Sequence, residues 1–192
     1  MTASTGRQGV ILYGPPASGK DSITAALAAL DARFQQFARL KVGSGRSVGY
    51  RMGTAEQLAQ LEAAGDVVYV NSRYNSTYVI DRPGLDAAFS AGVPVVHLGQ
   101  VDGVRALLER YPAGWKTVLL WCSRATAEAR SQGRGDADTP ARLAAWDATE
   151  QDLAAHAEFA WDLTLTTQAQ PPVESAHRIV QVLDQRTGAA TA

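Results

Sequence analysis

One glycine-rich segment near the N-terminus has the residue types and spacing that hold phosphate groups. It follows the pattern G-x-x-x-x-G-K and lies between an apolar run at 10–13 and a helix-forming run at 22–30. Glycines let the backbone curl so that successive N–H groups converge on one anion, and the following helix adds its positive N-terminal end. We therefore predict a phosphate-binding loop. Its expected contacts are Gly14, Pro15, Pro16, Ala17, Ser18, Gly19, Lys20, Asp21 and Ser22.

The end of this loop specifies the chemistry further. Lys20 is one of three lysines in a chain with fifteen arginines. It can reach the β- and γ-phosphates of ATP and offset the charge that moves during phosphoryl transfer. The next position is Asp21, where this motif usually has Ser or Thr. Because a carboxylate is a hard oxygen ligand, ATP and Mg²⁺ are the predicted cofactors, with Asp21 on the metal. The alternative, a glycine-rich turn capped by Asp21 and Ser22, fits the strand–loop–helix context less well.

The rest of the chain shows elements that could position this loop. Apolar runs alternate with helix-forming runs, which predicts an α/β fold with a mostly parallel sheet. Strands are expected near 10–13, 66–70, 77–80, 93–98, 117–122 and 161–165. Helices are expected near 22–30, 54–64, 83–91, 104–110, 125–130, 140–159 and 172–183. Residues 34–82 alternate less regularly, which indicates an insertion on the sheet. We expect a single domain at 1–187 and a flexible tail at 188–192.

Composition argues against several other classes of protein. The 192 residues suffice for one compact domain, and the net charge of −1 gives no general attraction for nucleic acid or anionic membranes. No apolar run approaches the ~20 residues that span a bilayer, and the polar N-terminus lacks the core of a signal peptide. The single cysteine, Cys122, excludes a disulfide framework within the chain. These features predict a cytoplasmic enzyme acting on a small molecule, a monomer or homodimer without nucleic-acid or membrane partners.

Beyond the loop, the chain resembles the guanylate kinase family over nearly its full length. The resemblance rests on the order of Gly65-Asp66-Val67-Val68, Thr77-Tyr78, Val101-Asp102-Gly103-Val104, Gly133-Arg134-Gly135, Ala141-Arg142-Leu143 and His156-Ala157-Glu158. The variant Gly19-Lys20-Asp21-Ser22 also looks like the ribose 1,5-bisphosphate phosphokinases of the same superfamily. The resemblance implies a three-layer P-loop kinase fold with an ATP-binding core, an acceptor-binding insertion at about 34–82 and a lid at about 124–142.

The same resemblance implies roles for residues outside the loop. Arg134 and Arg142 fall where the family has lid arginines that close over the transferring phosphate, so they join Lys20 as candidate catalytic residues. Arg46, Tyr50 and Tyr78 fall close to positions that grip the phosphate of the acceptor. Arg51 could replace a second family arginine that is otherwise missing. Arginine suits this role because it binds phosphate through two hydrogen bonds.

The positions that read guanine in the family are changed here. The guanine-reading acid corresponds to Tyr69, a serine corresponds to Ile80, and an acidic pair corresponds to Leu98 and Gln100. A carboxylate accepts two N–H bonds from guanine, and losing such a paired contact costs a factor of order 10⁴ in discrimination. We therefore predict transfer of the γ-phosphoryl group of ATP to a phosphorylated small molecule, a nucleotide or sugar phosphate, with GMP not preferred. Tyr69 and Gln100 are included in the expected acceptor site.

Three further hypotheses follow from the sequence. An alcohol acceptor would need a carboxylate base, for which Asp66 and Asp102 are candidates. The chain could be an ordinary guanylate kinase with its guanine contacts moved, for example to Asn71 or Asn75. It could also be a non-catalytic module that binds a phosphorylated ligand, although the intact loop argues against this. His97, at the end of an apolar run, is either a hydrogen-bonded core residue or catalytic.

Overall fold

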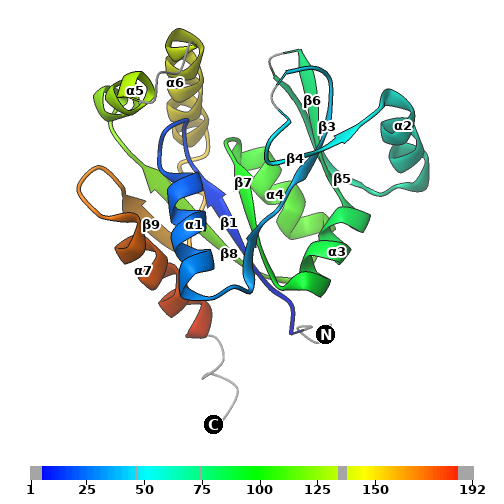
Figure 1. The fold of residues 1–192 in the computed structure, drawn as a ribbon, viewed down its shortest axis with the longest axis horizontal. Helices are drawn as coiled ribbons and strands as arrows, with labels where there is room; N and C mark the ends of the chain where they lie inside the picture. Colours follow the sequence, from blue (N-terminus) through cyan, green and yellow to red (C-terminus); the bar gives the residue numbers. More distant parts are fainter. Residues whose placement is uncertain (1–5, 46, 74, 134–137, 186–192) are drawn as a thin grey trace.

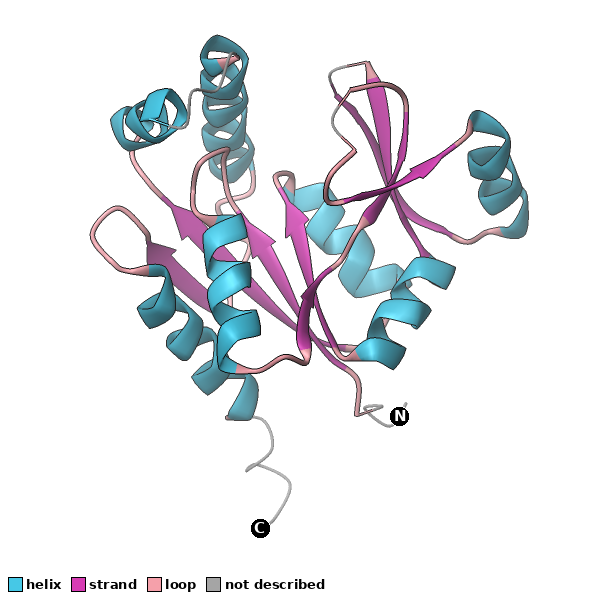
Figure 2. Cartoon of the chain, in the orientation of Figure 1, coloured by secondary structure: helices cyan, strands magenta, loops and turns pink. Residues whose placement is uncertain are grey.

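The computed structural model describes residues 6–45, 47–73, 75–133 and 138–185, which form nine strands and seven helices in two sheets (Figures 1 and 2). The strands are β1 (Gln8–Tyr13), β2 (Phe34–Gln36), β3 (Arg39–Val42), β4 (Tyr50–Gly53), β5 (Val67–Arg73), β6 (Ser76–Asp81), β7 (Val93–Leu98), β8 (Gly114–Trp121) and β9 (Leu163–Thr166). The helices are α1 (Lys20–Leu30), α2 (Ala55–Ala64), α3 (Arg82–Ala91), α4 (Val101–Arg110), α5 (Arg124–Gly133), α6 (Thr139–Ala155) and α7 (Pro172–Asp184). No described helix is long and apolar enough to cross a membrane.

The core is a five-stranded parallel sheet with helices on both faces. Its strand order is β2-β7-β1-β8-β9. In the central strand β1, Val10 and Leu12 pack with α1 and α7, whereas Ile11 and Tyr13 pack with α3 and α4. A strand buried on both faces is apolar along its length, which explains the continuous run at 10–13. This arrangement confirms the predicted three-layer α/β class.

A second, four-stranded sheet stands beside the core, with the order β4-β3-β6-β5. In it, β3 pairs antiparallel with β6 and parallel with β4, while β5 pairs antiparallel with β6. This sheet and the helices α5 and α6 rise on opposite sides of the carboxyl ends of the core strands (Figure 1). Ligands bind at that edge in open α/β sheets.

The expected elements are present with shifted ends, and β2, β3 and β4 are additional strands within the segment 34–82. The strand Phe34–Gln36, placed in the insertion by the sequence, pairs with β7 in the core sheet, so the second sheet begins at Arg39. The helix expected at 104–110 begins at Val101, where Gln100 is the N-cap residue. The long helix ends at Ala155 instead of Phe159, and His156 is its C-cap. The expected tail at 188–192 lies outside the described residues.

Candidate active site

The phosphate loop connects β1 to α1 at the carboxyl edge of the core sheet. Gly14 has no room for a side chain, because a Cβ there would lie 2.3 Å from the carbonyl oxygen of Leu120. Gly19 is the N-cap residue of α1 and has φ of 93°, a left-handed conformation that favours glycine. The two glycines of the motif are therefore required by close approach at one end of the loop and by backbone conformation at the other.

The carbonyl groups of the loop are held by neighbouring side chains. The guanidinium of Arg130, on α5, donates to the carbonyl oxygen of Ala17 at 3.0 Å. The hydroxyl of Thr167, just after β9, donates to the carbonyl oxygen of Ser18 at 2.9 Å. These bonds fix the loop, and the N–H groups of the first turn of α1 have no partner within the helix itself. The loop can therefore present backbone donors to an anion.

Lys20 lies within the loop. Its Nζ donates to the carbonyl oxygens of Gly14 at 2.7 Å and Pro15 at 2.8 Å. Burial lowers the pKa of Lys20 from 10.5 to about 8, against an opposing effect of the Asp21 charge. The ammonium form still predominates at neutral pH. Phosphate oxygens entering the loop could take the place of the two carbonyl partners.

Asp21, Ser22 and His97 lie at the mouth of the loop. Asp21 is 71% exposed, and its Oδ1 lies 3.5 Å from Nδ1 of His97. The other ring nitrogen of His97 lies 2.8 Å from Oγ1 of Thr24. Burial, together with the nearby charge of Lys20, holds the pKa of His97 well below its usual range, so this ring is neutral at physiological pH. His97 is thus a hydrogen-bonded residue at the edge of the loop.

The loop opens into a cavity of about 680 Å³ that extends to the second sheet. Leu98, Gly99 and Gln100 line it from the core sheet, and Arg142 and Thr149 line it from α6. Asp21 and Ser22, which also line the cavity, offer carboxylate and hydroxyl oxygens of the kind that Mg²⁺ prefers, so these residues fit that ion. Within the described residues, no group of three or more His, Cys, Asp or Glu side chains could hold a metal by itself.

One face of the second sheet forms the far wall of the cavity. Successive residues of a strand point to opposite faces, so residues two apart on these strands share the face that lines the cavity. The cavity-lining residues of this face are Arg39 and Lys41 on β3, Tyr50 on β4, Asn71 and Arg73 on β5, and Ser76 and Tyr78 on β6. The strand register places Tyr78 between Lys41 and Asn71 and pairs Arg39 with Tyr50.

The basic and aromatic side chains of this wall lie close together. The rings of Tyr50 and Tyr78 are 5.3 Å apart. The guanidinium of Arg39 lies 5.2 Å from the ring of Tyr78, and the ammonium of Lys41 lies 5.7 Å from the ring of Tyr50. Among the described lining residues, five are basic (Lys20, Arg39, Lys41, Arg73, Arg142) and two are acidic (Asp21, Asp138). The cavity therefore suits ligands with several negative charges.

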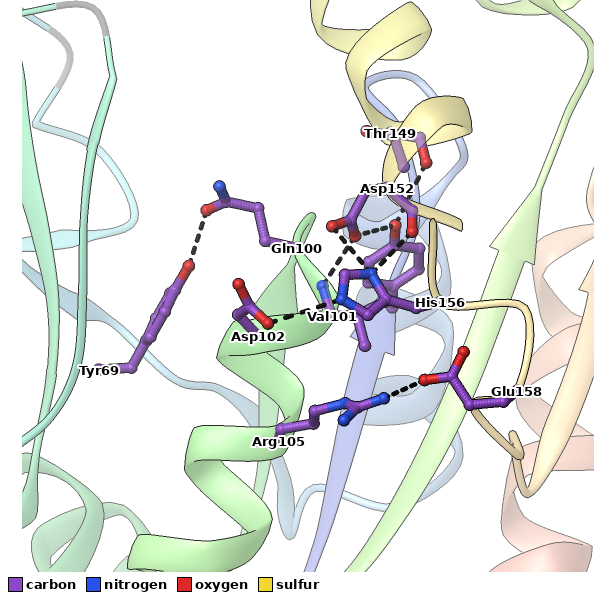
Figure 3. Close-up of polar contacts among 10 residues, drawn as sticks. Tyr69, Gln100, Val101, Asp102, Arg105, Thr149, Asp152, His156 and Glu158 are labelled. Carbon is purple, nitrogen blue, oxygen red and sulfur yellow. Dashed lines mark hydrogen bonds and ion pairs between the residues drawn. The ribbon is translucent and has the colours of Figure 1, made fainter. Parts of the chain in front are cut away.

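The structure brings most of the sequence-predicted residues to this cavity. Tyr50, Tyr78, Gln100 and Arg142 line it together with the loop. Tyr69 does not line it, but its hydroxyl donates to Oε1 of Gln100 at 2.7 Å (Figure 3). Arg46 and Arg134 lie outside the described residues.

Arg51 needs a correction. It stands on the opposite face of β4 from Tyr50, and its guanidinium forms an ion pair with Asp81, whose side chain is only 2% exposed. Its Nε also donates to the carbonyl oxygen of Ala38 at 2.8 Å. Because the side chain is committed to this structural pair, away from the cavity lining, Arg51 is removed from the acceptor set. The candidate bases Asp66 and Asp102 lie outside the cavity lining too, near Arg82 and His156.

The sequence alone did not indicate Arg39, and it indicated Arg73 only as part of the polar run 71–78, a candidate region for acceptor contacts. The signal that could have found them is the alternation Arg39-x-Lys41 and Tyr69-x-Asn71-x-Arg73, which puts these side chains on one face of the sheet. The family pattern directed attention to Arg46 instead.

A smaller cavity of about 310 Å³ lies on the other side of the loop. Ala17 and Gly19 line it from the loop, with Pro172 at the start of α7. Two buried polar atoms of its lining, Oε1 of Gln170 and Oγ of Ser175, have no hydrogen-bond partner among the described residues. Such atoms are costly to bury unless a ligand pairs with them. The cavity is suited to a flat, polar-edged group next to the phosphates.

The three-layer α/β fold, the strand–loop–helix and the two flanking cavities define a P-loop kinase. A family model described as "Chloramphenicol phosphotransferase-like protein" matches residues 8–184. The chain belongs to this chloramphenicol phosphotransferase-like family, and it is an ATP-dependent kinase. No curated protein matches it.

Three solved structures with the same fold are kinases. A guanylate kinase from Anaplasma phagocytophilum has a TM-score of 0.67 at 15% identity, covering 97% of this chain and 89% of that one. A gluconokinase from Sinorhizobium meliloti 1021 has a TM-score of 0.51 at 18% identity, covering 94% of both chains. A shikimate kinase from Acinetobacter baumannii, in complex with shikimate, has a TM-score of 0.50 at 13% identity, covering 95% and 96%. The similarity to guanylate kinase is thus one of fold.

Proposed function

We propose that this kinase transfers the γ-phosphoryl group of ATP to the phosphate group of a small phosphorylated molecule other than GMP, as a monomer or homodimer. The observation that carries the proposal is the basic wall of the larger cavity, where Arg39, Lys41 and Arg73 face the phosphate loop across the space for the acceptor. Several cations with tyrosine hydroxyls nearby are the groups that hold a phosphate ester.

In this proposal ATP lies along the loop. The triphosphate accepts hydrogen bonds from the backbone N–H groups of Ala17, Gly19 and Lys20 and an ionic contact from the Lys20 ammonium. The base occupies the smaller cavity, where Gln170 and Ser175 offer hydrogen-bonding atoms to its edge. Mg²⁺, held at Asp21 and Ser22, would neutralise phosphate charge when bound.

The acceptor phosphate would bind against Arg39, Lys41 and Tyr78 and point one oxygen towards the γ-phosphate. A phosphate oxygen is already anionic, so it needs no general base, and catalysis consists of alignment and charge stabilisation. Arg142, from the lid helix α6, would stabilise the charge that develops between the two phosphates. The lining offers two carboxylates among the described residues, neither of them on the basic wall.

An alcohol acceptor is the second candidate, favoured by one specific observation. The carboxylate of Asp21 is exposed in the cavity beside neutral His97, so it could accept a proton from a hydroxyl group. The family description, gluconokinase and shikimate kinase also name acceptors other than GMP. The basic wall favours the phosphate acceptor, because a neutral alcohol gains little from three cations.

An ADP-release assay with matched acceptors tests the proposal. The probes are ribose 5-phosphate, glucose 1-phosphate, AMP and GMP, each beside its dephosphorylated counterpart. We expect at least one phosphate ester to exceed GMP in kcat/KM by about 100-fold, and Lys20→Ala to abolish turnover. A kcat/KM for GMP near about 10⁶ M⁻¹s⁻¹ would favour an ordinary guanylate kinase instead. Turnover of only the dephosphorylated compounds would favour the alcohol acceptor.

A further inference from the structure

Gln100 stands where the core, the second sheet and the lid meet. It is the N-cap residue of α4 and lines the larger cavity, but its side chain does not cap the helix. Instead its amide reaches towards β5 of the second sheet (Figure 3). An N-cap side chain usually accepts a hydrogen bond from the first turn of its helix. The side chain of Gln100 makes no such bond, so it is available for a contact outside the helix.

The direction of the Gln100 amide is set by Tyr69. The Tyr69 hydroxyl donates to Oε1 of Gln100 at 2.7 Å. Burial raises the pKa of Tyr69, so the hydroxyl keeps its proton and remains a donor. With Oε1 accepting this bond, the two N–H groups of the Gln100 amide are available as donors to a ligand in the cavity.

The backbone of Gln100 is fixed as well. The next residue, Val101, donates its N–H to Oδ2 of Asp152 on α6 at 2.8 Å (Figure 3). The hydroxyl of the buried Tyr13 donates to the same oxygen at 2.8 Å. The side chain is therefore held from β5, and the main chain beside it is held from α6. A fixed donor selects for ligand geometry better than a mobile one.

Asn71 supplies the complementary group. It stands two residues after Tyr69 on the same face of β5 and also lines the cavity. Its Oδ1 is buried and has no hydrogen-bond partner among the described residues. A buried acceptor without a partner costs free energy, which a donor group of a bound ligand would recover. The wall beside the basic cluster therefore offers one donor and one acceptor.

Building on the proposed function, we propose that Gln100, oriented by Tyr69, and Asn71 are specificity-determining residues that bind a hydroxyl group of the acceptor. A hydroxyl oxygen accepts from the amide of Gln100 while its proton is donated to Oδ1 of Asn71. The acceptor is then a phosphorylated sugar or polyol.

The guanine-reading carboxylate of the guanylate kinase family only accepts hydrogen bonds, whereas the amide of Gln100 can also donate. Guanine presents the acceptor O6 beside its donors N1–H and N2–H₂, so one donor and one acceptor do not by themselves exclude it. Discrimination against GMP at this position therefore depends on the loss of the paired carboxylate contact, which Gln100→Glu would restore in part.

Matched deoxy compounds and three variants test the inference. Binding by calorimetry and kcat/KM are measured for ribose 5-phosphate, glucose 6-phosphate, their 2-deoxy analogues, a 3-deoxyglucose 6-phosphate and GMP. The variants are Gln100→Glu, Tyr69→Phe and Asn71→Ala, and Gln60→Glu on the exposed face of α2 is the matched control. ATP affinity and the thermal midpoint show whether each variant remains folded with an intact loop.

In the wild type we expect that removing at least one sugar hydroxyl weakens binding and lowers kcat/KM by about tenfold or more. Gln100→Glu should change the ratio of kcat/KM for sugar phosphate to kcat/KM for GMP in favour of GMP by at least about tenfold. Tyr69→Phe and Asn71→Ala should reduce the difference in kcat/KM between each sugar phosphate and its deoxy analogue. Unchanged ratios in all three variants, with sugar phosphates still turned over, would overturn this inference alone. Failure of the wild type to bind or turn over any of these phosphates would overturn it together with the proposed function.

Discussion

At the scale of single residues, the site depends on charges placed in partly buried positions. Lys20 is fixed against loop carbonyls, and Arg39 and Lys41 are fixed against tyrosine rings. Each charge is costly to keep from water, and an anionic ligand recovers that cost. The candidate functional charges are therefore those that line the cavity, even where, as for Lys20 and Lys41, the ammonium also donates to a backbone carbonyl.

The depressed pKa of Lys20 predicts how ATP binding depends on pH. The pKa of Lys20 in the free enzyme is about 8, so the ammonium that phosphates need is lost as the pH rises above that value. The dissociation constant for Mg-ATP should stay level from about pH 7 to 8 and then rise towards tenfold per pH unit. Calorimetry across this range measures it. In Lys20→Arg, whose side chain does not titrate there, the rise should disappear, and an identical rise in that variant would assign it to another group.

The same shift acts on stability in the opposite direction. A lowered pKa in the folded state means that the unfolded chain binds more protons between pH 8 and 10.5. The contribution of Lys20 to the free energy of unfolding should therefore increase as the pH rises through that window.

Arg39 and Arg51 make a matched pair for separating binding from folding. Arg39→Met should raise the KM for the phosphorylated acceptor about 10- to 100-fold, because it removes a charge-assisted contact. Arg51→Met should leave that KM within about twofold but lower the free energy of unfolding by about 1–3 kcal/mol, since Asp81 loses its ion pair. Steady-state kinetics and urea denaturation of both variants check this. A large effect of Arg51→Met on KM, with stability intact, would return Arg51 to the acceptor site.

At the scale of elements, the site combines the carboxyl ends of the apolar core strands with one face of the second sheet, whose strands mix polar and apolar residues. The strand β1 and the loop after it could be predicted because an apolar run, two glycines and a lysine are local signals. The basic wall could not be assigned because β3 and β4 are four residues each, and because β3 is placed by its pairing with β6, which lies far along the chain. The ion pair of Arg51 with Asp81 is likewise set by tertiary structure.

A hydrogen bond between α4 and α6 anchors α6 to the core. Oδ2 of Asp152 accepts from both Val101 N–H and the Tyr13 hydroxyl at 2.8 Å (Figure 3). Asp152→Ala leaves two donors without this carboxylate, so the free energy of unfolding should fall by about 2–3 kcal/mol. Urea denaturation measures it, with Asp147→Ala as the control, whose exposed ion pair with Arg124 should matter much less. Equal decreases in the free energy of unfolding of the two variants would mean that the Asp152 hydrogen bonds stabilise the fold no more than an exposed ion pair does.

At the scale of the whole molecule, two walls of different character enclose one reaction space. The phosphate loop and α6 lie on one side of the cavity and the second sheet lies on the other, both above the carboxyl ends of the core strands (Figure 1). In the proposed function these are the donor and acceptor sides. The fold class could be predicted because it follows from periodicity, and the loop could be placed because it follows from one motif. The solved kinases of this fold are named for different acceptors, so the acceptor proposed here is argued from the side chains that the second sheet brings together.

The most direct test asks which bond the enzyme makes. ³¹P NMR of the products formed from Mg-ATP and the best phosphate ester distinguishes the two acceptor chemistries. Transfer to a phosphate group gives a new phosphoanhydride, with a pair of coupled resonances beside those of ADP. Transfer to a hydroxyl group gives an additional uncoupled phosphomonoester signal. We predict the coupled pair, and the lone monoester signal would contradict a phosphate acceptor.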